Sequence, residues 1–199
     1  MSKKIAIQGE LGAYSHIAAE NLFKGAEIKT CVTFEETFKQ AFNDPSYEIV
    51  IPIENSLAGR VADIHYLLPK YKLQIHGEHF QVVEHNLLSK PEAKIEDIRF
   101  VRSHAQAIGQ CQNLINKRKF KSIISADTAG SAKDLAEGKD KTIAAIASEL
   151  SAKIYNLKVL EKNIEDEKGN VTRFLIMGKN IEQPEFLKDK KFITSCIFR

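Results

Sequence analysis

The sequence has no tryptophan and only three cysteines among its 199 residues. Cys31, Cys111 and Cys196 are odd in number and far apart, which argues against a disulfide framework or a zinc site. Three reduced thiols in a cytoplasmic protein are the simplest interpretation. No apolar run is long enough to span a bilayer, and residues 1–10 pass from two lysines directly into strand-like sequence without a signal segment. We therefore expect a cytoplasmic protein with no membrane partner.

The sequence also lacks an excess of charge of either sign. Its 29 Lys and Arg against 26 Asp and Glu leave a formal net charge of +3, mixed along the chain. This balance gives no case for nucleic acid or a membrane surface as a partner, and it modestly favours a small anionic ligand. With 43% hydrophobic residues, the chain is long enough for one large domain or two small lobes.

Strand-like and helix-like segments alternate along the chain, which predicts an α/β protein with parallel or mixed sheets. Strands are expected at 4–8, 28–32, 47–53, 73–83, 86–88, 98–101, 121–125, 142–146 and 171–177. We expect a first lobe from residues 1–79 plus 164–179 and a second lobe from residues 80–163. A charged linker follows at 180–191, and residues 192–199 have the composition of a strand without a partner.

Local signals predict where several helices begin and end. Ser15 is expected to cap a helix over 15–23, and Thr33 with Glu36 forms a capping box. Pro69 is expected to stop a helix over 63–68, and one helix is expected from about 105 to 117. Gly12, ahead of the first helix, permits a tight turn and close backbone approach.

Small polar residues follow the ends of several strands and begin helices. The junctions are 12–15, 55–56, 103–106, 127–128 and 148. In open parallel sheets, ligands bind beyond the carboxyl ends of the strands, where helix N-termini suit carboxylate or phosphate. At any one junction a plain N-cap is the simpler interpretation. The recurrence at five junctions favours a cleft for a small anion between two lobes.

Other groupings of reactive side chains are weaker. His76, His79 and His85 lie in extended chain without a carboxylate or cysteine at ligand spacing, so we expect no metal site. Ser103 and His104 are neighbours and are not a nucleophile–base pair. Glu54, which follows a buried strand, fits either a general acid or base or an acceptor for loop N–H groups.

Six segments together resemble the catalytic domain of prephenate dehydratases. They are GELGAYSHIAAE at 9–20, PIENSLAGRV at 52–61, VRSHAQAIGQC at 101–111, SADTAGSA at 125–132, AAIASELSAKIYNL at 144–157 and NVTRFL at 170–175. The resemblance covers residues 4–179. It implies two α/β lobes like a type II periplasmic binding protein, with the active site in the interlobe cleft. The implied reaction converts prephenate to phenylpyruvate, carbon dioxide and water without a metal or organic cofactor.

The resemblance also implies roles for particular residues. Thr172 would align a hydrogen bond or relay a proton to the leaving oxygen, with Asn55 and Gln110 as further donors. Ser103 would help to hold the retained carboxylate, and Arg173 would either assist it or be structural, paired with Glu54. The expected catalytic residues are thus Thr172, Asn55, Gln110 and Ser103, and the expected substrate-binding residues are Arg173, Phe174, Ser15, Glu54, His104, Thr128 and Ala129.

Two alternatives to this function stay open at the level of sequence. Arogenate dehydratases share these motifs, and a two-lobed module could bind a small carboxylate without chemistry. Prephenate dehydratases usually carry a C-terminal ACT domain, and residues 192–199 resemble its first strand. We expect a homodimer, with inhibition by phenylalanine only where an ACT domain is present.

Overall fold

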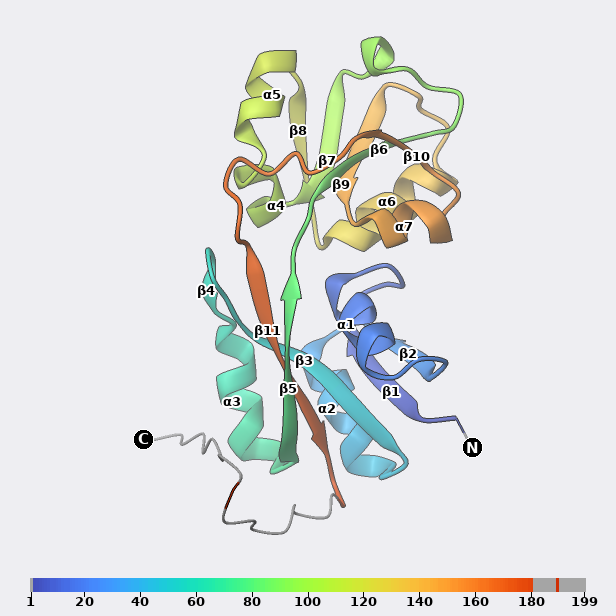
Figure 1. Cartoon of the computed structure of the whole chain (residues 1–199). Helices are drawn as coiled ribbons and strands as arrows, with labels where there is room; N and C mark the ends of the chain where they lie inside the picture. The colour runs from blue at the N-terminus through green and yellow to red at the C-terminus, as the bar shows by residue number, and fades with distance from the viewer. Residues whose placement is uncertain (1, 181–188, 190–199) are drawn as a thin grey trace.

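The computed structural model describes residues 2–180 and residue 189. Two mixed sheets, each flanked by helices, form two lobes (Figure 1). This arrangement confirms the predicted α/β class. Among the described residues, no helix is long and apolar enough to cross a membrane. The expected linker lies almost wholly, and the expected strand at 192–199 wholly, outside the described residues, as does Cys196; Cys31 and Cys111 are buried free thiols.

The first lobe is built on a sheet with the strand order β2-β1-β3-β11-β5, to which the short β4 adds by pairing with β3. β1 pairs in parallel with β2 and β3, whereas β11 runs antiparallel between β3 and β5. Its elements are β1 (Lys4–Gln8), α1 (Tyr14–Leu22), β2 (Glu27–Cys31), α2 (Phe34–Asn43), β3 (Tyr47–Asn55), β4 (Gly59–Arg60), α3 (Ala62–Tyr71), β5 (Gln74–Val82) and β11 (Val171–Gly178).

The second lobe is built on a sheet with the strand order β10-β6-β9-β7-β8, in which β7 is parallel to β8 and β9. Its elements are β6 (Asn86–Ser89), η1 (Ile95–Asp97), β7 (Phe100–His104), α4 (Ala105–Gly109), α5 (Gln112–Arg118), β8 (Lys121–Ser125), α6 (Thr128–Glu137), β9 (Ile143–Ala147), α7 (Glu149–Ile154) and β10 (Lys158–Glu161). Each lobe has two clusters of buried apolar side chains.

Two connecting segments, called the crossings below, run side by side between the lobes (Figure 1). The outgoing one follows β5, which stays in the first sheet through Val82. The returning one leads from β10 to β11. The two crossings are hydrogen-bonded to each other, because Val83 N donates to Asn170 O at 2.8 Å and Ile164 N donates to His85 O at 2.9 Å. His85 and Asn170 therefore lie where the lobes join.

Three local predictions need correction. Pro69 does not stop its helix: α3 continues to Tyr71, because Leu68 and Tyr71 are buried and hold the last turn in the core. Ser15 is not the N-cap of α1, a position that Ala13 occupies; its hydroxyl donates to Gln8 O instead. Thr33 is the N-cap of α2, as expected, with Glu36 N donating to Thr33 Oγ1 at 3.1 Å, but the Glu36 carboxylate accepts from Val32 N rather than from Thr33 N, so the box is not closed.

The third correction concerns the helix expected over 105–117, which breaks into α4 and α5 at Gln110 and Cys111. The carboxylate of Asp166 accepts hydrogen bonds from Gln112 N at 2.8 Å and Asn113 N at 3.0 Å, which gives α5 its own capped start. Asp166 N also donates to Gln110 O at 2.7 Å. The returning crossing therefore fixes the break and the position of Gln110.

Candidate active site

A cavity of about 530 Å³ lies between the lobes, within the range of small-molecule sites. The ends of β1, β3 and β11 and the segment before α3 line it from the first lobe, and α4 and the start of α6 line it from the second. The crossings contribute Val83, His85 and Asn170. The cavity is thus walled by the carboxyl ends of several strands and the N-terminal ends of several helices.

Asn55 and Thr172 are brought together by strand pairing. Asn55 is the last residue of β3, Thr172 is the second residue of β11, and the two are cross-strand neighbours. Asn55 Nδ2 donates to Thr172 Oγ1 at 2.9 Å. Only 9% of Thr172 is exposed, so its hydroxyl is reached from the cavity rather than from open solvent.

The orientation of the Asn55 amide follows from its backbone partners. Asn55 Oδ1 accepts from Leu57 N at 3.0 Å and from Ala58 N at 2.8 Å, so the oxygen must face these two donors. Nδ2 then points the other way, and its two hydrogens go to Thr172 Oγ1 and, at 2.6 Å, to Asn170 Oδ1. Both side-chain N–H groups of Asn55 are therefore committed within the protein, to Asn170 and to Thr172, rather than free for a ligand as expected.

A chain of hydrogen bonds continues from Asn170 into the second lobe. Asn170 Nδ2 donates to Gln110 Oε1 at 2.9 Å, and His85 Nε2 lies 2.9 Å from the same oxygen. On the other side of the ring, His85 Nδ1 lies 3.0 Å from the hydroxyl of Tyr14, which is also 2.7 Å from Glu84 O. The chain links α1, both crossings, α4 and β11 into one polar unit.

Two donors of this unit are uncommitted. The Thr172 hydroxyl accepts from Asn55, and its own proton has no acceptor among the residues that the structure describes. Gln110 Oε1 uses its two lone pairs on Asn170 and His85, and Gln110 Nε2 has no partner in the described part of the chain. Both side chains line the cavity. A bound molecule can therefore receive hydrogen bonds from each of them.

Burial sets the protonation of the groups behind the cavity. Burial lowers the pKa of His85, opposed by its hydrogen bond to Gln110 and by the charge of Glu165. Burial first, and then the charge of Glu165, raises the pKa of Tyr14 well above its usual value. A neutral imidazole and a neutral phenol are therefore favoured at neutral pH.

Most of the expected site residues meet in the cavity. The lining includes Thr172, Asn55, Gln110, Phe174, Ser15, His104 and Thr128. Ala129 is fully buried and Glu54 is exposed, and neither is part of the lining. Ser103 is also fully buried and outside the lining, and its hydroxyl donates to Ile146 O at 2.6 Å inside the second sheet.

Arg173 is held by a partner that the sequence did not indicate. Its Nη2 and Nε lie 2.6 and 2.8 Å from Glu78 Oε2, on β5, rather than against Glu54. Its guanidinium also lies 5.9 Å from the centre of the Phe80 ring, and it is not part of the cavity lining. Of the two interpretations of Arg173, this geometry supports the structural one.

The lining residues that sequence reasoning did not assign to the site include Tyr14, His85, Asn170 and Arg60. Arg60, on the exposed hairpin that closes β3, is the one Lys or Arg among the described lining residues. Asn170 could have been identified from the sequence, because it lies two residues before Thr172 and side chains two apart in extended chain point to the same side. His85 was considered only as a metal ligand together with His76 and His79. In the structure His85 pairs with Gln110, His76 with Glu48 and His79 with Gln81.

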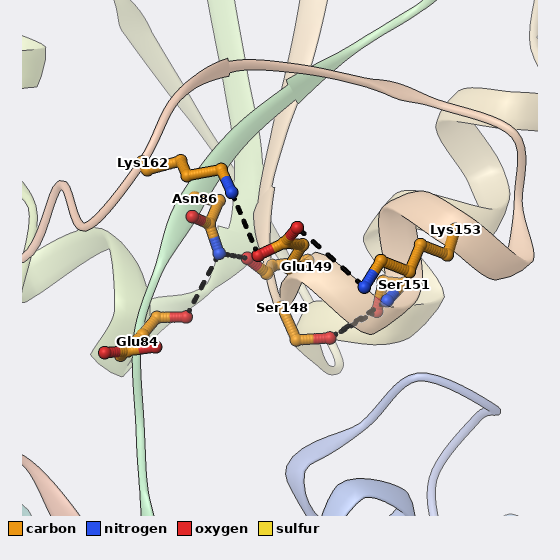
Figure 2. A network of polar contacts seen from close by, with 8 residues as sticks. Glu84, Asn86, Ser148, Glu149, Ser151, Lys153 and Lys162 are labelled. Carbon is orange, nitrogen blue, oxygen red and sulfur yellow. Dashed lines mark hydrogen bonds and ion pairs between the residues drawn. The ribbon is translucent and has the colours of Figure 1, made fainter.

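The lobes are held together beside the cavity by the loop between β1 and α1. Ser148 Oγ and Ser151 Oγ donate to Gly12 O at 2.6 and 3.0 Å. Figure 2 shows both serines at the start of α7, above the blue loop of the first lobe, with Glu149 beside them pairing with Lys162 and Lys153. A Cβ on Gly12 would lie 2.4 Å from Ser151 Oγ, so this approach requires glycine, as the sequence predicted.

The model of the prephenate dehydratase family matches residues 5–182. The bifunctional N-acyl-homoserine lactone acylase/prephenate dehydratase of Komagataeibacter europaeus is 38% identical over 98% of this chain and 69% of that protein. Arogenate dehydratase 2 of Petunia hybrida is 39% identical over 98% of this chain, which spans only 49% of that protein. The solved prephenate dehydratase of Staphylococcus aureus has a TM-score of 0.78 and 27% identity, covering 92% of this chain and 68% of its own. The chain belongs to the prephenate dehydratase family.

Proposed function

We propose that this chain catalyses the decarboxylating dehydration of prephenate to phenylpyruvate, carbon dioxide and water. The observation that carries the proposal is the state of Thr172. Its hydroxyl lines the cavity, accepts from Asn55, and keeps its own proton for a ligand. A hydroxyl held in this way is a preorganised donor aimed at one point, the arrangement that stabilises a developing negative charge.

The reaction needs such a donor at one atom. Prephenate loses its ring carboxylate as carbon dioxide and its ring hydroxyl as hydroxide, and the electron pair of the broken C–C bond completes the aromatic ring. One proton, taken up from solvent, turns the hydroxide into water. Thr172 is a weak acid, so its contribution is a hydrogen bond that aligns and stabilises the leaving oxygen while a proton is delivered. Gln110 Nε2 supplies a second donor from the opposite lobe.

The two carboxylates of prephenate need partners as well. Ser103 is committed to Ile146 O and Arg173 to Glu78, so both are weaker candidates than the sequence suggested. Arg60 lines the cavity and has no ion-pair partner among the described residues. We propose that Arg60 holds one substrate carboxylate, since a guanidinium can bind a carboxylate with two parallel hydrogen bonds.

Arogenate is the second candidate substrate. It differs from prephenate by an ammonium group in place of the side-chain keto oxygen. Two carboxylate residues, Asp63 and Asp127, line the cavity and could pair with an ammonium group. Several relatives are named arogenate dehydratases or arogenate dehydratase/prephenate dehydratases. Prephenate stays the main proposal, because the family model that matches the chain is that of prephenate dehydratase.

The test measures turnover of prephenate by the wild type, Thr172→Val and Thr172→Ser. The wild type should convert prephenate to phenylpyruvate. Thr172→Val keeps the branched shape without the hydroxyl and should lower kcat by more than about tenfold, or about 1.4 kcal/mol. Thr172→Ser keeps the hydroxyl and should retain most of the activity. A smaller loss in Thr172→Val would contradict the role of Thr172, and binding of prephenate without its consumption would indicate a binding module. Parallel assays with arogenate decide the substrate.

We also propose a cytoplasmic homodimer, with inhibition by phenylalanine only where an ACT domain accompanies this one. β5 lies at the edge of the first sheet and exposes Phe80 and Val82, which supports an interface there. Sedimentation equilibrium of the chain tests the dimer, and a single species with the mass of one chain would refute it.

A further inference from the structure

The direction of every hydrogen bond between Asn55 and His85 can be deduced. The two backbone donors at Asn55 Oδ1 force Asn55 Nδ2 to donate to Asn170 Oδ1. Asn170 Nδ2 must then donate to Gln110, so the Gln110 atom that faces Asn170 is the oxygen. The same oxygen faces His85 Nε2, which must carry a hydrogen to donate.

This direction does not depend on the charge of His85. In the neutral ring, the hydrogen sits on Nε2, and the Tyr14 hydroxyl donates to Nδ1 at 3.0 Å. In the protonated ring, Nδ1 donates to Tyr14, whose own proton goes to Glu84 O at 2.7 Å. Tyr14 can therefore form a hydrogen bond with Nδ1 in both protonation states of the ring. The backbone of His85 is held separately, because His85 N donates to Glu165 Oε2 at 2.9 Å.

The hydrogen bond from His85 to Gln110 fixes how the Gln110 amide faces the cavity. His85 and Asn170 together occupy both lone pairs of Gln110 Oε1, so the amide cannot rotate without losing two bonds. Gln110 Nε2 is therefore kept free on the cavity side. His85 is only 3% exposed, so no water from open solvent replaces its donor.

We propose that His85, fixed by Tyr14, is a positioning residue that keeps the Gln110 amide nitrogen aimed at the reacting molecule. This inference rests on the proposed dehydratase function of the same cavity. His85 acts through Gln110, and it takes no proton from the substrate and gives none to it. A positioning residue of this kind is needed for the transition state more than for binding, so its loss lowers kcat rather than raising KM.

The first experiment compares His85→Leu, His85→Gln and Tyr14→Phe. His85→Leu should lower kcat for prephenate by about 10- to 100-fold with KM changed less than about threefold, the usual size of an effect transmitted through a ligand-orienting residue. His85→Gln places an amide N–H near the position of Nε2 and should recover most of kcat. Tyr14→Phe should lower kcat less than His85→Leu, because Nε2 keeps its hydrogen-bond acceptor.

A matched control is His76→Leu, since His76 lies near the far end of β5 and pairs with Glu48 outside the cavity lining. It should leave kcat unchanged. A double-mutant cycle separates positioning from general damage: in the Gln110→Leu background, His85→Leu should cost less than about twofold in kcat, because its effect runs through the missing amide. A full additive loss would overturn the proposal.

A second measurement needs no activity and no variant. Nitrogen-15 NMR of the wild type with labelled histidine should show the His85 ring, when neutral, with its hydrogen on Nε2. A neutral ring with its hydrogen on Nδ1 would overturn the proposal, because it could not donate to Gln110. Absence of prephenate turnover by the wild type would instead refute the proposed function, so the two failures are distinguishable.

Discussion

The uncommitted proton of Thr172 is a consequence of one amide, that of Asn55. Because two backbone N–H groups fix Asn55 Oδ1, its nitrogen is left to donate to Thr172 rather than accept from it. Threonine elsewhere in the chain is used differently: the Thr33 hydroxyl accepts from a helix N–H, and the Thr37 hydroxyl donates to Thr33 O. The neighbours of a side chain, more than its type, decide whether it can serve a ligand.

Arg60 and Arg173 allow a test at the residue scale. Arg60→Gln should raise KM for prephenate by about tenfold or more, equivalent to about 1.4 kcal/mol, because a carboxylate partner is lost. Arg173→Gln should leave KM nearly unchanged and reduce the free energy of unfolding by less than about 1 kcal/mol, since the pair with Glu78 is partly exposed. Steady-state kinetics and urea unfolding measure both. A KM effect in Arg173→Gln alone would reverse the two assignments.

At the scale of elements, the break between α4 and α5 matters most for the site. In a continuous helix over 105–117, Gln110 would be an ordinary residue in the middle of the helix. Instead α4 ends at Gly109, and the Asp166 carboxylate starts α5. Gln110 is then held by Asn170 and His85 from the two crossings. An element boundary set by a residue more than fifty positions away thus places a donor in the cavity.

The contact of the β1–α1 loop with α7 can be tested by two glycine variants. Gly12 has φ +92°, and a Cβ there would lie 2.4 Å from Ser151 Oγ; Gly25 has φ +75° with nothing within 4 Å of its Cβ position. Both variants place alanine at positive φ, which costs about 1–3 kcal/mol. Gly12→Ala should lose more unfolding free energy than Gly25→Ala and should also lose activity, because the clash separates the lobes. Equal losses and equal activities would show that the interlobe contact is unimportant.

At the scale of the whole molecule, two buried histidines link stability to pH. Burial lowers the pKa of His85 and of His16, with opposing effects from Gln110 and Glu165 in one case and Glu20 in the other. In the unfolded chain both have the ordinary pKa of about 6.5. Between the folded and unfolded pKa values the unfolded chain binds more protons, so the free energy of unfolding falls as pH drops below about 6.5.

The pH dependence can be measured by urea unfolding of the wild type and His85→Gln at pH 7.5, 6.5 and 5.5. The wild type should be less stable at pH 5.5 than at pH 7.5. The variant has lost one of the two depressed histidines and should show a smaller decrease over the same interval. An identical decrease in both proteins would mean that His85 does not titrate with a lowered pKa.

The sequence by itself determined the features that depend on neighbours a few residues apart. The alternation of strands and helices, the capping of α2 by Thr33 and the capping of α6 by Asp127 all appear as predicted. Each rests on bonds within one turn or one strand, which local sequence encodes. The resemblance to prephenate dehydratases also pointed to Thr172 and Asn55, whereas their pairing across β3 and β11 is known only from the structure.

Only the tertiary structure decided which polar groups are free. Ser103 is occupied by Ile146, 43 residues away, and Arg173 by Glu78, 95 residues away, so two expected substrate contacts are committed elsewhere. His85 is hydrogen-bonded to Gln110, 25 residues away in the sequence, and lies 3.0 Å from the hydroxyl of Tyr14, 71 residues away. Both contacts form because His85 lies where the chain passes from one lobe to the other. These pairings depend on how the sheets and lobes pack, and hydrogen-bond capacity is a property of the assembled neighbourhood that no local pattern in the chain specifies.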